Sequence, residues 1–185
     1  MGTLKTTNIQ TITGSGTLTL GTSGETVNLG SGVSGGTLTN KPAFHVWNSS
    51  ATSIADNAWT KINTQSAVFD TDSWHDTTNN RITVPAGTAS GYMLFNWSVR
   101  MNLDGLGDNT SAALRKNGSQ ISQQLKFYSG PEAEAMGYTN SIVYSYAAGD
   151  YFELYAFQDN ASNVAKNTNP SVSDTYITGM RLIGV

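Results

Sequence analysis

The strictest constraint on the fold of this 185-residue chain is an alternation of side chains over residues 91–101. Every second residue there is apolar: Met93, Phe95, Trp97, Val99 and Met101. Polar side chains lie between them, at Asn96, Ser98 and Arg100. A β-strand turns successive side chains to opposite faces, so the first set lines a core and the second faces outward. The segment predicts a central strand of an antiparallel sheet.

Strand signals continue to the C-terminus without a helical pattern. Ten strands are predicted, at residues 43–48, 58–64, 66–70, 81–84, 90–102, 111–117, 120–127, 138–147, 150–158 and 175–184. Asn117-Gly118 predicts a tight hairpin, and Gly149-Asp150 predicts a similar turn. Only 12% of the residues are charged, and the abundant Thr, Ser, Asn and Gly favour strands and turns. The fold class is therefore an all-β antiparallel sandwich or jelly roll.

The composition changes near residue 40. Residues 1–40 contain no aromatic residue and all four tryptophans follow them, so we divide the chain into an N-terminal arm (1–40) and a compact domain (41–185). The arm is rich in Thr, Gly and Leu and repeats one pattern, at residues 17–21 and 26–30. Short strands of this kind bury almost nothing alone. The arm is either a flexible linker or a segment that orders by winding with identical copies, and its regularity favours the second.

Composition also excludes several functions. A net charge of −3 without any cluster of Lys and Arg argues against nucleic-acid binding. The absence of cysteine removes disulfides and thiolate metal sites. Neither a signal peptide nor an apolar run of membrane-spanning length is present, so we expect a soluble protein made in a cytoplasm, without membrane insertion.

The order of the motifs resembles that of the C1q/TNF-like trimeric jelly-roll domain. The matching segments, in chain order, are residues 41–44, 68–70, 80–85, 91–97, 114–118, 148–151 and 176–182. The family's Gly-X-Y collagen stalk is missing. In its place stands the Thr/Gly/Leu arm, which looks like an attachment region of a bacteriophage fibre or virion protein.

The resemblance implies a homotrimeric structural protein of a virion rather than an enzyme. Residues 1–40 would bind other virion proteins, and the jelly-roll knob of residues 41–185 would recognise a host surface or a glycan. One alternative is a decoration protein that stabilises the capsid and has no ligand. Another is a free carbohydrate-binding module, although such a module has no use for the arm.

Catalytic signals are weak. His45 and His75 are the only histidines, and no Gly-x-Ser-x-Gly nucleophile turn is present. His45 lies in a predicted strand and is interpreted as a packing or interface residue. We therefore predict no catalytic residues and no obligatory cofactor.

The best candidate for a ligand site is the segment 70–76. Trp74 offers a ring that can cover a pyranose, and Asp72, His75 and Asp76 can bind its hydroxyls. Asp70, Asp72 and Asp76 could present oxygen ligands to a calcium ion, although the glycine and glutamate of a full calcium loop are missing. The alternatives are a solvated polar loop and a tryptophan that caps the sandwich. Weaker candidates are the acidic turn 104–108, Tyr128 and the polar loop 158–163.

Overall fold

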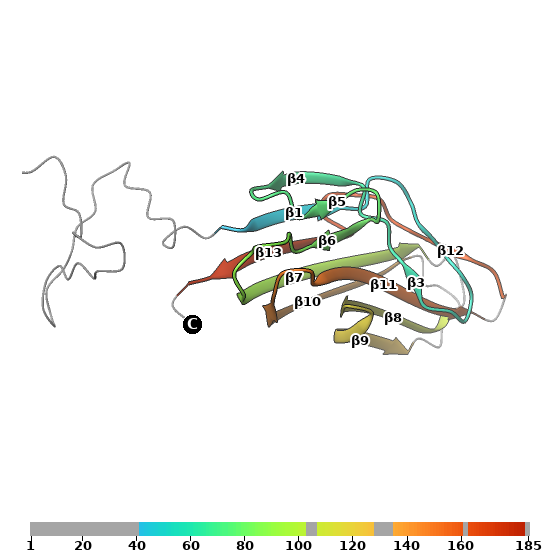
Figure 1. Cartoon of the computed structure of the whole chain (residues 1–185). Helices are drawn as coiled ribbons and strands as arrows, with labels where there is room; N and C mark the ends of the chain where they lie inside the picture. The colour runs from blue at the N-terminus through green and yellow to red at the C-terminus, as the bar shows by residue number, and fades with distance from the viewer. Residues whose placement is uncertain (1–40, 103–106, 128–134, 161–162, 184–185) are drawn as a thin grey trace, which may run out of the picture. The chain divides into compact units, whose positions relative to one another are not determined.

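The computed structural model describes residues 41–102, 107–127, 135–160 and 163–183. These residues form thirteen strands, and none of them lies in a helix (Figure 1). Three predicted features lie outside the described residues: the arm (1–40), residues 104–106 of the acidic turn, and Tyr128. None of the described segments forms a helix of the length and hydropathy that a membrane span needs.

Seven strands form one antiparallel sheet. They are β1 (Ala43–Trp47), β2 (Ser53–Ile54), β4 (Ser66–Asp70), β7 (Gly91–Asn102), β10 (Ala135–Tyr146), β12 (Lys166–Thr168) and β13 (Tyr176–Leu182). Their order is β2-β12-β7-β13-β1-β4, and β10 pairs with β7 along its whole length. The predicted strand at residues 90–102 is therefore central, as its alternation indicated.

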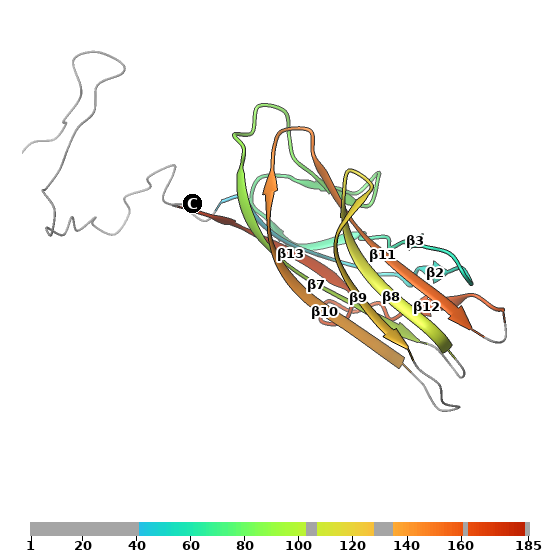
Figure 2. The ribbon, with the colours of Figure 1, turned by 90° about the horizontal axis from the view of Figure 1, so that it is seen from below.

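The other six strands form the second antiparallel sheet. They are β3 (Thr60–Lys61), β5 (His75–Asp76), β6 (Arg81–Thr83), β8 (Gly107–Lys116), β9 (Ser119–Phe127) and β11 (Tyr151–Asn160). The order is β5-β6-β11-β8-β9, and β3 pairs with β11. Figure 2 shows β11 beside the β8–β9 hairpin.

The core lies between the two sheets. The five apolar residues predicted to face it from β7 are all fully buried. From the opposite sheet come Leu114, Phe152 and Leu154, and the rings of Phe95 and Phe152 lie 4.5 Å apart. Burial of a large apolar side chain stabilises the folded state by about 1.5–3 kcal/mol. The packing between the sheets therefore holds this cysteine-free chain together.

The two predicted turns differ in what they connect. Asn117 and Gly118 have φ values of 51° and 79°, as a two-residue hairpin turn requires, and they join β8 to β9. The prediction of a hairpin at Gly149-Asp150 is wrong, because β10 pairs with β7 in one sheet and β11 pairs with β8 in the other. The turn there carries the chain across the sandwich.

Candidate functional site

Trp74 is a core residue. Its side chain is only 2% exposed, and its ring lies 5.1 Å from that of Tyr146 and 6.2 Å from that of Phe44. Ser73, directly before it, has a φ of 58°, and the carbonyl of Trp74 accepts a hydrogen bond from the Thr83 amide at 2.7 Å. The prediction that Trp74 offers an exposed stacking ring is wrong. The alternative, a tryptophan that caps the sandwich, describes the observed packing.

The carboxylates of this segment have separate partners. Asp70 accepts from the His75 amide at 2.8 Å, Asp72 accepts from the Thr71 hydroxyl, and Asp76 accepts from Asn79 at 2.7 and 2.9 Å. Hydrogen bonds from Asn79, with a smaller effect of Arg81, lower the pKa of Asp76 below its usual value. Within the described ranges, no three acidic or histidine side chains are grouped as a metal site would need. The geometry therefore gives no support to calcium at Asp70, Asp72 and Asp76.

His75 also serves the fold. Its Nε2 atom donates to the carbonyl of Thr64 at 2.7 Å, which joins the loop before β4 to β5. In the predicted polar loop 158–163, Gln158 and Asn160 are buried, and Asn160 bonds to Asp56. Asp72 is exposed, but the ring of Trp74 is buried, so the segment 70–76 does not combine a stacking ring with polar groups on one surface, and Gln158 and Asn160 of the loop are buried as well.

The outer face of the seven-stranded sheet is the stronger candidate. Four apolar residues lie directly opposite one another across β1, β13, β7 and β10: Ala43, Met180, Leu94 and Val143. We call these four residues the outer row. Val143 is 51% exposed and Met180 is 38% exposed, while Leu94 and Ala43 are half-buried.

More apolar side chains flank the outer row. Tyr92 lies two residues before Leu94 on the same face of β7, and its side chain is 48% exposed. Phe69 on β4 is 44% exposed. The outer face of a one-sided antiparallel sheet is normally polar. A contiguous exposed apolar patch on a soluble domain usually marks an interaction site.

A polar network lies beside the outer row on the same face. Nδ1 of His45 is 2.8 Å from the Thr178 hydroxyl, and its ring stacks on Tyr176 with centroids 5.0 Å apart. Tyr176 donates to Asn96 at 3.1 Å, and Asn96 donates to Ser141 at 3.0 Å. These bonds restrict the side chains of the face, and His45 packs on Tyr176 within it.

Sequence reasoning missed the outer row. The signal at Tyr92 and Leu94 was present, since both are apolar positions in the outward half of the β7 alternation. Val143 and Met180 join them only through the strand register, which no local pattern contains.

No protein-family model and no curated protein sequence matches the chain. Solved structures do match its fold. Murine APRIL at pH 5.0 aligns with a TM-score of 0.58 and 12% identity, over 76% of this chain and 98% of that one. Eiger TNF from S. frugiperda aligns with a TM-score of 0.55 and 14% identity, over 77% and 93% of the two chains.

The globular domain of the zebrafish complement 1qA protein aligns with a TM-score of 0.53 and 11% identity, over 78% of this chain and 98% of that one. None of these three proteins is named as an enzyme. At such identities the likeness establishes the fold alone. It confirms the C1q/TNF-like jelly roll that the order of the motifs predicted.

Proposed function

We propose that this chain, which has the C1q/TNF-like jelly-roll fold, is a homotrimeric structural protein of a virus particle. Residues 41–185 form its knob and associate through the outer face of the seven-stranded sheet. Residues 1–40 attach the trimer to other virion proteins, and the knob recognises a surface glycan of the host. The observation that carries the self-association is the outer row.

The chemistry of this face suits a second copy of the same chain. The outer row has no charged side chain, and Arg100, farther along the same face of β7, is paired with Asp174, so identical rows can meet without like-charge repulsion. Covering Val143, Met180 and Tyr92 would remove apolar area from water at about 25 cal/mol per Å². The resemblance described above favours three copies over two.

Protection of single thiols tests where the chains meet. Because the chain has no cysteine, Val143→Cys introduces a unique thiol on the proposed interface. Leu125→Cys is the matched control, since Leu125 is 50% exposed on β9 of the other sheet. At micromolar concentration, Val143→Cys should react with a maleimide at least ten times more slowly than Leu125→Cys. Equal reaction rates would place the interface elsewhere.

The virion assignment rests on the arm and has its own test. Antibodies raised against residues 41–185 should label virus particles in electron micrographs. The particles are purified from the organism or virus that encodes the chain. Regular labelling at a fibre or on a head supports the proposal. Recovery of the protein only in the particle-free fraction would favour the free carbohydrate-binding module.

A further inference from the structure

The outer face of the six-stranded sheet carries a second cluster, built of aromatic rings and charges. On β11 the core-facing residues alternate with Tyr151, Glu153, Tyr155 and Phe157, which point the other way. Arg115 lies opposite Glu153 on β8, and Lys61 lies opposite Tyr155 on β3. The sheet register therefore places aromatic and cationic side chains together on one outward face.

Arg115 contacts two of these rings. The centre of its guanidinium lies 4.1 Å from the ring centroid of Tyr155 and 5.0 Å from that of Trp59. Trp59 in turn lies 5.7 Å from Phe157. Trp59, Arg115 and Tyr155 are all half-buried, so packing restricts them while part of each stays in contact with water. We call these three residues the arginine platform.

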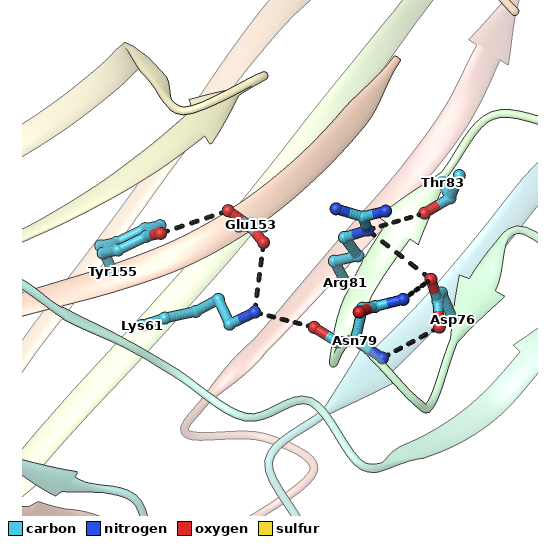
Figure 3. A network of polar contacts seen from close by, with 7 residues as sticks. All are labelled: Lys61, Asp76, Asn79, Arg81, Thr83, Glu153 and Tyr155. Carbon is cyan, nitrogen blue, oxygen red and sulfur yellow. Dashed lines mark hydrogen bonds and ion pairs between the residues drawn. The ribbon is translucent and has the colours of Figure 1, made fainter. Parts of the chain in front are cut away.

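Four other charged side chains on this face already have partners: Lys61, Glu153, Arg81 and Asp76 (Figure 3). Oε1 of Glu153 accepts from Lys61 at 3.2 Å, and its Oε2 accepts from the Tyr155 hydroxyl at the same distance. Arg81 lies 3.6 Å from the carboxylate of Asp76. Burial and the nearby Glu153 raise the pKa of Tyr155, so its phenol stays protonated and keeps donating. Each oxygen of Glu153 therefore accepts a hydrogen bond from a group other than Arg115.

Arg115 contacts two aromatic rings but forms no ion pair among the described residues. Across the described parts of the chain, no carboxylate lies within ion-pair distance of it, and its Nε is buried without a hydrogen-bond partner. A guanidinium offers a planar fork of donors that matches a carboxylate. The parts of Trp59 and Tyr155 that the guanidinium does not cover offer the apolar surface on which a pyranose can pack. The platform thus combines a binder of carboxylates with a binder of sugar rings.

We propose that the arginine platform binds a carboxylate-bearing saccharide. Arg115 pairs with the sugar carboxylate, and Trp59 and Tyr155 cover the face of the pyranose. The proposed function includes recognition of a glycan. The arginine platform gives that recognition a site and a ligand class, and it rests on the proposed function for the glycan recognition alone. Self-association uses the other sheet.

Calorimetric titration of the full chain tests the ligand class. The acidic probes are 3′-sialyllactose and a trimer of galacturonic acid, which separate the two kinds of carboxylate sugar. Their neutral counterparts are lactose and a trimer of galactose. At least one acidic probe should bind with a Kd below about 1 mM, and its neutral counterpart at least ten times more weakly. Absence of binding by both acidic probes, or equal binding of acidic and neutral sugars, would overturn the proposal.

A glutamate oligomer of matched charge separates a saccharide from an acidic peptide. It carries carboxylates but has no ring face to stack on Trp59 and Tyr155. We expect it to bind at least ten times more weakly than the acidic sugar. Binding as tight as that of the sugar would contradict the saccharide assignment.

Variants of the platform test the residues. Arg115→Gln should weaken binding of the acidic sugar at least tenfold, whereas Arg100→Gln, which removes a half-exposed cation from the other sheet, should not change it. Arg115→Lys keeps the charge and the aliphatic stem but loses the planar fork of donors. Its affinity for the acidic sugar should therefore lie between those of the unchanged chain and Arg115→Gln. Unchanged binding in both Arg115 variants would overturn the assignment, and unfolding curves check that each is folded.

Sedimentation of the same variants separates this proposal from the proposed function. Arg115→Gln should leave the oligomeric state unchanged, because Arg115 lies on the six-stranded sheet. A trimer that binds no acidic sugar would overturn the arginine platform alone. A monomer that binds acidic sugar would overturn the proposed self-association alone.

Discussion

Gly179 lies so close to Phe44 that a Cβ atom at position 179 would be 2.3 Å from Cζ of the phenylalanine ring. The same Cβ would be 2.6 Å from Sδ of Met93. Gly179 pairs with Phe44 in β1 and with Phe95 in β7, so it sits where the core approaches the backbone of β13. No other residue type fits this position without movement of the core.

Gly179→Ala should therefore destabilise the domain. The added methyl group forces the ring of Phe44 or the side chain of Met93 from its position, and overpacking of this kind costs about 1–3 kcal/mol. Denaturant unfolding measures the change. Gly137→Ala is the control, since a Cβ there would meet nothing within 4 Å. Equal stability of Gly179→Ala and the unchanged chain would show that the core around Phe44 is loosely packed.

Trp74→Ala should behave as a core substitution. Removal of a buried aromatic side chain costs about 3–5 kcal/mol, a large part of the stability of a typical domain. Asp72→Ala, in the same segment but exposed, should change the free energy of unfolding by less than about 0.5 kcal/mol. The two variants are compared by chemical denaturation. If Trp74→Ala lowers the free energy of unfolding as little as Asp72→Ala does, Trp74 is not a core residue.

Asp150 should make stability depend on pH. Partial burial raises the pKa of this carboxyl, but hydrogen bonds from Lys116 at 2.7 Å and from Asn117 at 2.8 Å outweigh it, so the pKa falls below its usual value. The unfolded chain then binds a proton at a higher pH than the folded domain. The stabilisation by Asp150 is present above the unfolded pKa of about 4 and is lost as pH falls further.

Asp150→Asn tests this linkage. The variant loses the ion pair with Lys116 and should be less stable at pH 7 by about 1–3 kcal/mol. Unfolding followed between pH 7 and pH 3 should show a shallower decline for the variant than for the unchanged chain. Parallel declines would mean that other carboxylates carry the pH dependence.

Long alternating strands were predictable from the sequence, and three of the very short ones were not. Residues 91–101 fix a period of two over a whole strand, and the two-residue turn at Asn117-Gly118 requires the positive φ angles that these residue types favour. The strands β2, β5 and β12 contain only two or three residues each, too few for any periodicity. Their pairing is decided by neighbours that are distant in the sequence.

The candidate sites show a similar division. Trp74 stands among polar residues, so its local sequence suggests a loop, and only the packing on Phe44 and Tyr146 places it inside. The turn at Gly149-Asp150 was visible in the sequence, but no local signal says which sheet the next strand joins. Arg115 on β8 meets Trp59, the residue before β3, across β11, and this contact follows only from the sheet order.

The molar mass of the full chain in sedimentation equilibrium tests the central claim most directly. At micromolar concentration we expect three times 19.7 kDa for the unchanged chain and for Leu125→Glu. Val143→Glu, which places a charge in the outer row at a site of similar exposure, should sediment as a folded chain of 19.7 kDa. A monomeric unchanged chain, or a Val143→Glu variant that stays trimeric, would contradict association through the outer face of the seven-stranded sheet.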